Sequence, residues 1–533
     1  LIVSSNKVIL MTDKRKAQPL SIAIKDKRIA WIGSHQDAKH IQGKHIDFGN
    51  QAVLPGFIDA HGHASYLAFA TQVANIASPP VGKINTINEL QAELKKFIKK
   101  SNLKPGEWII GLGYDDSLLE EQRHPTKDDL DKVSTEHPIY LIHVSAHLGA
   151  ANTLGLSLAN INSETQDPPG GKIRRYENSS KPNGVFEETA AYPLQQLAMS
   201  AYKDPIGSVK QAMEIYARNG ITTAQDGASS LETIHLIKAA DAQDMIDLDI
   251  ISYPIGQNRL DKNLNSINFG SYEGRLKIGG IKLILDGSPQ GKTAYLTEPY
   301  YKPPHSESDS YKGYPLIPQS EVSKWVKKYA DLNIPIMAHA NGDAAADMLI
   351  KAVKDADINS DHRTIMIHAQ TVREDQLDQM KELKIIPSYF STHTFYWGDW
   401  HRDSVFGKDR AMRISPTKST LNRNMPFTVH NDAPVVPPDM IRLLWSTTNR
   451  KTRSGKVLGE EQKISTYSAL EAMTINAAYQ HFEDDIKGSI EVGKLADLVV
   501  LSEDPLSIDT KNLLEVNVVA TFSRGVEVFN SAK

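Results

Sequence analysis

The sequence lacks cysteine altogether, and it also lacks long apolar runs and any excess of basic charge. The absence of cysteine excludes disulfides, thiolate metal ligands and cysteine nucleophiles. No segment approaches the run of about 18 apolar residues that a transmembrane helix needs, so no membrane association is predicted. The 60 Lys and Arg residues are offset by 64 Asp and Glu residues. Because no basic patch stands out, no nucleic-acid partner is expected.

The side chains left to bind a metal are imidazoles, carboxylates and, after modification, lysine. The 18 His residues supply enough imidazoles, and such a ligand set favours zinc or a similar divalent ion. The sequence shows no signal peptide. Its compartment is left open between the cytoplasm and, if a signal peptide has been removed, the periplasm or the exterior.

The pattern of predicted secondary structure changes along the 533 residues, which are too many for one ordinary hydrophobic core. Residues 1–53 and 485–533 read as short strands separated by turns, such as Arg28–Gly33 and Val518–Ser523. We therefore predict a small β-sandwich domain built from both termini. Residues 54–484 are predicted to form the main domain, with an insertion of about residues 65–215.

Strand and helix patterns alternate over this main domain. The predicted strands include Ile221–Ala224, Asp249–Pro254, Gly280–Leu285, Ile334–Ala338, Arg363–Ile367, Ile385–Tyr389 and Phe427–Val429. This repetition predicts an α/β fold with parallel strands, and the number of strands suits a TIM-like (β/α)8 barrel with the insertion over its mouth. A doubly wound open sheet is the alternative, but no Gly-x-Gly-x-x-Gly motif follows the first strands.

Polar side chains stand where the apolar strands stop. His61 and His63 end one such run, and residues two apart in a strand project from the same face, so both can bind one metal. His339, His368 and Asp432 follow three later strands. Because the carboxyl ends of barrel strands converge on the face that carries active sites, these five residues predict a site for one or two divalent cations.

Lys282 is a cation inside the otherwise apolar strand Gly280–Leu285. An unpaired buried ammonium is costly, so Lys282 needs a partner or a chemical change. One interpretation is an ion pair with Asp286 or Glu187. The other is a carbamylated Lys282 that bridges two metals, because burial favours the neutral amine that reacts with CO₂.

A series of motifs along nearly the whole chain resembles a known family. The motifs are Pro55–His63, Gly113–Asp116, Arg123–Thr126, His143–His147, Gly220–Thr223, Lys282–Ser288, His339–Asp343, His393–Asp399, Asp432–Val435 and Gly488–Leu498. With them the chain resembles the metal-dependent amidohydrolase superfamily. Within it, the chain is most similar to the amidohydrolase-3 branch, which includes N-substituted formamide deformylase-like and exoenzyme-regulator-like proteins.

This resemblance implies a TIM-like barrel with a β-sandwich from both termini. It places Lys282 at a position that is carboxylated in some related enzymes. It also implies a metal centre made of His61, His63, His339, His368 and Asp432.

The expected reaction is hydrolysis of a carbon–nitrogen bond in a small N-acyl or N-formyl amine. One or two Zn²⁺ ions would acidify water, and Asp432 would act as general base and then protonate the leaving amine. Substrate contacts are expected from motif residues near the barrel mouth, namely Tyr114, His147, His393 and Trp397. Alternatives are a cyclic amidase, a heterocycle deaminase or a non-catalytic regulator on the same scaffold. A homo-oligomer is also left open.

Overall fold

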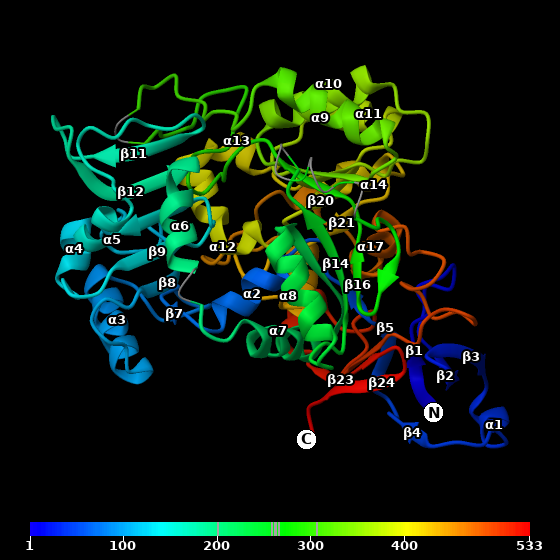
Figure 1. Cartoon of the computed structure of the whole chain (residues 1–533). Coiled ribbons are helices and arrows are strands. Elements are labelled where there is room, and N and C mark those ends of the chain that lie inside the picture. Colours follow the sequence, from blue (N-terminus) through cyan, green and yellow to red (C-terminus); the bar gives the residue numbers. More distant parts are fainter. Residues whose placement is uncertain (200–201, 257–259, 261–263, 265–266, 305–306) are drawn as a thin grey trace.

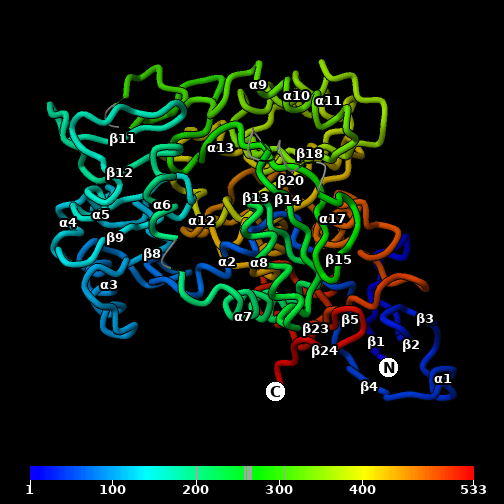
Figure 2. The backbone as a smooth tube through the Cα atoms, in the orientation of Figure 1, coloured from blue at the N-terminus to red at the C-terminus, as the bar shows by residue number. Residues whose placement is uncertain are grey.

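The computed structural model describes residues 1–199, 202–256, 260, 264, 267–304 and 307–533. Both ends of the chain contribute to one eight-stranded sheet of order β24-β23-β22-β5-β1-β2-β3, with β4 beside β1. The two termini lie in the same part of the molecule (Figure 2). The strands are β1 (Ile2–Val8), β2 (Gln18–Lys25), β3 (Arg28–Gly33), β4 (His45–Asp47), β5 (Ala52–Pro55), β22 (Leu498–Leu501), β23 (Val518–Ser523) and β24 (Val526–Asn530). The domain boundaries suggested by the sequence stay a prediction.

Two five-stranded sheets occupy the middle of the molecule. One has the order β15-β16-β14-β13-β6, and the other has the order β17-β18-β19-β20-β21. All neighbours are parallel except β15 and β16. The strands are β6 (Phe57–Ile58), β13 (Ile221–Ser229), β14 (Asp249–Pro254), β15 (Tyr272–Glu273), β16 (Leu276–Ile278), β17 (Ile281–Ile284), β18 (Ile336–Ala340), β19 (Ile365–His368), β20 (Ile386–Tyr389) and β21 (Thr428–Val429).

The two sheets contact each other in two places, one after β14 and one after β6 and β21. On one side, Ile255 forms an isolated parallel bridge with Lys282 of β17. On the other side, the Asp432 N–H donates to the His61 carbonyl at 3.1 Å, and the His63 N–H donates to the Ala433 carbonyl at 2.8 Å. By strand pairing the central strands form two separate sheets. The contacts between them lie where adjacent strands of the predicted barrel would meet.

Helices cover the outside of these strands (Figure 1). Helix α7 (Pro205–Arg218) begins after Asp204, whose side chain accepts the Gly207 N–H, and it ends before Gly220, which has a φ of +80°. The other helices that follow strands of the two sheets are α2 (Ala64–Ala70), α8 (Leu231–Asp241), α9 (Gln319–Asp331), α10 (Asp343–Ala356), α11 (Glu374–Glu382), α12 (His393–Trp400), α13 (Gly407–Ala411), α14 (Thr417–Asn422), α15 (Met440–Asn449), α16 (Thr466–Met473) and α17 (Ile475–Gln480). Among the described residues, none of the helices has both the length and the apolar character to span a membrane.

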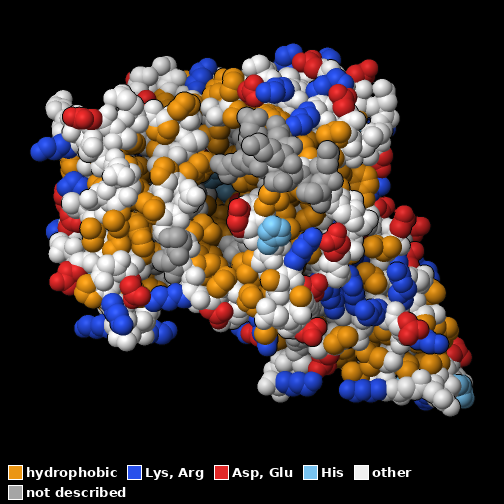
Figure 3. All heavy atoms as spheres, viewed as in Figure 1, with side chains coloured by type: hydrophobic (Ala, Val, Ile, Leu, Met, Phe, Trp, Pro, Cys, Tyr) orange, Lys and Arg blue, Asp and Glu red, His pale blue; other side chains and the backbone are white. Residues whose placement is uncertain are grey.

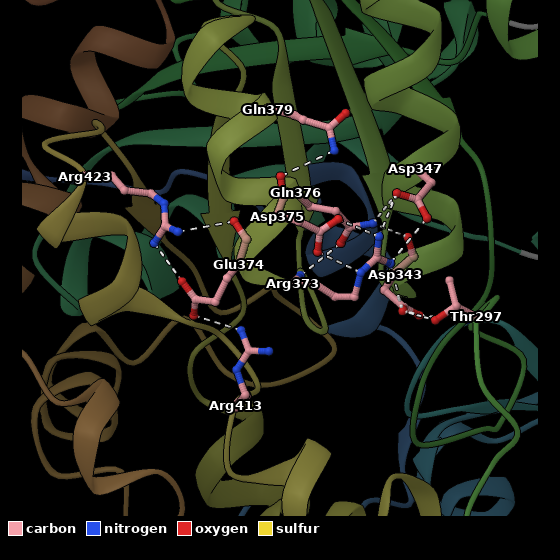
Figure 4. A network of polar contacts seen from close by, with 10 residues as sticks. All are labelled: Thr297, Asp343, Asp347, Arg373, Glu374, Asp375, Gln376, Gln379, Arg413 and Arg423. Carbon is pink, nitrogen blue, oxygen red and sulfur yellow. Dashed lines mark hydrogen bonds and ion pairs between the residues drawn. The ribbon is translucent and has the colours of Figure 1, made fainter.

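Arg373, just before α11, ties that helix to α10. Its guanidinium lies 3.1 Å from Asp343 and 3.1 Å from Asp347 of α10, and 3.0 Å from Asp375 of α11 (Figure 4). Because α10 directly follows β18, this network fixes the outer helix behind the strand that carries His339.

The inserted segment forms a six-stranded sheet of order β11-β12-β10-β9-β8-β7. Thr86 caps helix α3 by accepting the Glu89 N–H, and the Glu89 carboxylate accepts the Asn85 N–H. The sheet lies beside the two central sheets, at the left of Figure 1. Its elements are β7 (Ala74–Asn75), α3 (Ile87–Ser101), β8 (Ile109–Tyr114), α4 (Lys127–Asp131), β9 (Ile139–His143), β10 (Leu148–Ala151), α5 (Thr153–Leu158), β11 (Gly171–Arg175), β12 (Pro182–Glu188) and α6 (Tyr192–Met199).

Candidate metal centre

The structure brings together side chains from five strands of the two central sheets. His61 and His63 follow β6, Asp432 follows β21, and the other three residues lie within strands β17, β18 and β19. All but His63 are buried. The residues brought together are His61, His63, Lys282, His339, His368 and Asp432.

Asp432 lies between two groups of imidazoles. Its Oδ1 atom is 3.0 Å from His63 Nε2 and 3.4 Å from His61 Nε2, while its Oδ2 atom is 4.0 Å from His368 Nε2. In the second group, His368 Nε2 lies 3.1 Å from His339 Nδ1. One carboxylate thus faces both groups, an arrangement that suits one cation or a pair of cations.

The hydrogen bonds on the far side of each ring fix which nitrogen is free. His61 Nδ1 lies 2.6 Å from the Gln225 side-chain carbonyl, so Nδ1 carries the proton and Nε2 keeps its lone pair. His339 Nε2 lies 3.1 Å from both the Gly287 carbonyl oxygen and the Asn341 side-chain nitrogen, and a proton on Nε2 that is donated to Gly287 leaves Nδ1 as the free nitrogen. Both free nitrogens point into the group of candidate ligands.

His368 is oriented by His430, a residue for which the sequence analysis predicted no role. Its Nδ1 lies 3.2 Å from His430 Nε2, and His430 Nδ1 lies 3.0 Å from the Ser388 hydroxyl. A proton on His368 Nδ1 and one on His430 Nδ1 satisfy this chain, and His368 Nε2 is again left free. His430 therefore belongs to the shell behind the candidate ligands.

These donors fit a divalent cation on two counts. Burial lowers the pKa of His61, His339 and His368 well below the usual range, so their nitrogens offer lone pairs at neutral pH. Two free nitrogens facing each other at 3.1 Å, as in His339 and His368, repel unless a proton or a cation lies between them. In tetrahedral zinc with bonds of about 2.0–2.1 Å, neighbouring donors lie roughly 3.3 Å apart, close to the distances observed.

Lys282 lies inside this centre, and it forms neither of the ion pairs considered above, with Asp286 or with Glu187. Its Nζ atom is 3.1 Å from His61 Nε2. Asp286 instead accepts backbone N–H groups such as that of Asn341, and Glu187 pairs with Arg174. Burial lowers the pKa of Lys282 to about 7, against the opposing effect of Asp432.

Asp432 remains ionised in this setting. Burial alone would raise its pKa, but the nearby imidazoles of His368, His63 and His61 outweigh that effect and hold the pKa well below its usual range. An ionised carboxylate beside the ligand atoms can bind a cation, and one that also borders the water site can accept a proton.

Of the four residues predicted to contact substrate, His147 is the one whose ring lies against a candidate ligand. Its centroid is 5.0 Å from that of His339. The Phe390 ring lies between His393 and the candidate ligand His368. Its centroid is 4.4 Å from that of His393 and 6.0 Å from that of His368. The face viewed in Figure 1 is hollowed near its centre, and imidazole atoms are visible inside the hollow (Figure 3).

Tyr114 and Trp397 are buried and hydrogen-bonded within the protein. The Tyr114 hydroxyl lies 3.1 Å from His124 Nδ1. The Trp397 indole N–H donates to Asp115 at 2.6 Å. Both of these hydrogen bonds are to polar residues that follow β8 in the chain, and a role in binding substrate stays a prediction.

A second group of possible ligands, Asp115, Asp116 and His143, lies at the ends of β8 and β9. His143 Nε2 is 3.0 Å from Asp116, and its Nδ1 is 2.8 Å from the Ser145 hydroxyl. With Trp397 bonded to Asp115, hydrogen bonds within the protein already satisfy the group. It is consistent with a network that ties the two strands together.

Sequence reasoning missed Gln225, although a signal was present. Gln225 is a buried amide inside β13, and such a group needs hydrogen-bond partners. The predicted strand Ile221–Ala224 stopped one residue short of it. His430 was visible in the run that ends at Asp432 but was given no role.

Comparison with known proteins identifies the class. An uncharacterised metal-dependent hydrolase from Pyrococcus horikoshii has the same fold, with a TM-score of 0.76 and 22% identity over 96% of this chain and 99% of that one. The zinc complex of atrazine chlorohydrolase TrzN from Arthrobacter aurescens aligns with a TM-score of 0.54 and 11% identity, over 100% and 96% of the two chains. The architecture is that of the α/β metal-dependent hydrolases.

Sequence comparison narrows this class to a family. The profile described as the amidohydrolase family matches residues 44–529. The chain is also 27% identical to the N-substituted formamide deformylase of Arthrobacter pascens, over 99% of this chain and 97% of that protein. The chain belongs to the amidohydrolase family and is a metal-dependent hydrolase of carbon–nitrogen bonds.

Proposed function

We propose that the protein hydrolyses the amide bond of a small N-formyl or N-acyl amine, with zinc as its divalent metal. The observation that carries this proposal is the convergence of His61, His63, His339, His368 and Asp432 at spacings of 3.0–4.0 Å. The N-formyl group is favoured because the chain resembles a formamide deformylase along its whole length. No serine or cysteine nucleophile is required.

In this proposal Asp432 is the general base, a role supported by its ionised carboxylate among the candidate ligands. A bound zinc ion supplies acidified water and a polarised carbonyl. Asp432 accepts one proton from the attacking water as the new carbon–oxygen bond forms. It then delivers that proton to the nitrogen as the carbon–nitrogen bond breaks, giving a carboxylic acid and a free amine.

Lys282 is proposed to act as a carbamate. Its neutral amine would attack CO₂, lose a proton and give an anionic carbamate beside His61, which would be a further ligand for a cation. The pKa of about 7 makes the neutral amine available near physiological pH. A carbamate would also remove the cost of a buried ammonium beside His61.

The test uses protein stripped with a chelator and reloaded with zinc. It is offered N-formyl amines, N-acyl amines, lactams and aminated heterocycles, and amine or ammonia release is measured. We expect zinc-dependent release of amine from the first two classes. Turnover confined to lactams or heterocycles would contradict the substrate class. Full zinc loading with no turnover of any substrate would favour the non-catalytic regulator.

A further inference from the structure

Glu188 is a buried carboxylate that the proposed reaction does not use. It is the last residue of β12 and only 1% exposed. One oxygen, Oε2, lies 2.7 Å from His147 Nδ1. The other, Oε1, is buried without a hydrogen-bond partner among the described residues. A half-satisfied buried carboxylate is costly for stability, so folding alone gives no reason for a charged group here.

The backbone around this pair is strained. Glu188 has a φ of +49°, and Ala146, next to His147, has a φ of +59°. Such conformations cost a non-glycine residue about 1–3 kcal/mol and cluster at functional sites. The Glu188 N–H also donates to the His147 carbonyl at 2.7 Å. The two residues are therefore held together through backbone and side chain at once.

Glu188 also packs against the backbone that orients a candidate ligand. A Cβ atom added at Gly287 would lie 2.3 Å from Glu188 Oε1, so only glycine leaves room for this carboxylate. The Gly287 carbonyl is the group that fixes the His339 ring at 3.1 Å. The pair thus sits directly beside the metal centre.

His147 presents its remaining nitrogen to the site. With Nδ1 bonded to Glu188, Nε2 is the nitrogen left over, and no described residue forms a hydrogen bond with it. The ring lies 5.0 Å from that of His339, its side chain is 18% exposed, and Nε2 is not among the fully buried side-chain atoms that lack a partner. It is placed to meet a group bound in the centre.

We propose, resting on the amide hydrolysis above, that His147 hydrogen-bonds the scissile amide through Nε2 and that Glu188 is its positioning residue. Glu188 fixes the ring by holding Nδ1–H, in the way that outer carboxylates orient working histidines elsewhere. Glu188 itself does not touch the substrate. Its effect on rate therefore passes entirely through His147.

The test is a double-mutant cycle of Glu188→Gln and His147→Gln, with kcat, KM and zinc content measured for each protein. We expect His147→Gln to lower kcat about 100-fold and Glu188→Gln about 10-fold or more, with KM within about threefold and zinc unchanged. The double variant should be no slower than His147→Gln alone. Multiplying effects, or loss of zinc in Glu188→Gln, would overturn the positioning role.

Glu187→Gln is the matched control. Glu187 precedes Glu188 on the same strand, but its carboxylate pairs with Arg174 at 2.6 Å instead of His147. It should leave the effect of His147→Gln unchanged, so that the two effects multiply. If Glu187→Gln and His147→Gln were coupled as strongly as Glu188→Gln and His147→Gln, the effect would belong to strand β12 in general and the specific role of Glu188 would be refuted.

Nitrogen NMR of labelled histidine separates this inference from the proposed reaction. The wild-type protein should show His147 with a fixed Nδ1–H, and Glu188→Ala should show ring nitrogens that exchange between tautomers. If no amide is hydrolysed, the proposed function fails while this spectrum still reports on the pair. Identical His147 signals in both proteins would overturn the inference.

Discussion

Gln225 is expected to control metal affinity without touching the metal. Its side-chain carbonyl accepts the His61 Nδ1–H at 2.6 Å, and its Nε2 donates to the Ala60 carbonyl at 2.7 Å. In Gln225→Met, His61 loses the partner that fixes its tautomer and its ring orientation. Loss of such an outer partner typically weakens metal binding by about 10- to 100-fold, or about 1.4–2.8 kcal/mol.

The rest of the fold should tolerate this change. The Ala60 carbonyl keeps a second donor, because Gln480 Nε2 also binds it at 2.7 Å. The main cost to folding is then the His61 Nδ1–H left buried without an acceptor, about 1–3 kcal/mol for such a group. Gln480→Met is the matched control, since it removes the same kind of contact to Ala60 but none to His61.

The assay is competition for zinc against a fluorescent chelator at fixed pH, with total metal measured in parallel. We expect Gln225→Met to bind zinc at least tenfold more weakly than the wild type, and Gln480→Met to stay within about twofold. Equal affinities of Gln225→Met and wild type would refute the tautomer argument for His61. Equal losses in the two variants would assign the effect to packing under Ala60.

Three further outcomes are expected. Asp432→Asn should retain at least one zinc but lose turnover about 1000-fold, and wild-type turnover would remove Asp432 from the role of base. Lys282 should gain the mass of one CO₂ when zinc is reloaded with bicarbonate. Activity restored in this way should rise from pH 6 to pH 8 as the amine with a pKa of about 7 loses its proton, and a flat profile would contradict the carbamate. Asp249→Ala should lower the free energy of unfolding by about 3–5 kcal/mol, because it leaves the buried ammonium of Lys487, 2.8 Å away, without this partner. Denaturant unfolding measures this loss. In the control variant Asp378→Ala, which removes an exposed carboxylate, the free energy of unfolding should fall by less than about 1 kcal/mol.

The strands and the clustering of candidate ligands could be predicted because both depend on local pattern. Strands β3, β14 and β23 have the bounds read from the sequence. His339 and His368 come at the end of apolar runs, and parallel strands bring such ends together without knowledge of packing. Lys282 stood out for a similar reason, as a charge inside an apolar strand.

The groups behind the ligands could not be predicted, because their partners are remote in sequence. Gln225 is 164 residues from His61, and Glu188 is 41 residues from His147. No spacing rule links such pairs before the strands are placed. Helix ends also escape the pattern, since helices α16 and α17 are separated only by Thr474, whose φ and ψ are −132° and −93°. An apolar period continues across such a break and so does not reveal it.

Several unfavourable features lie at the candidate metal centre, and together they are a physical reason to regard it as the working site. His368, Asp432 and Glu188 all have positive φ values, of +71°, +58° and +49°. The free nitrogens of His339 and His368 face each other at 3.1 Å. Natural proteins break the agreement of local conformation, hydrogen bonding and charge with the fold mainly where function requires it. A divalent cation between Asp432 and the imidazoles would offset the lone-pair repulsion directly. Binding would then stabilise the folded state by the free energy that the metal-free site lacks.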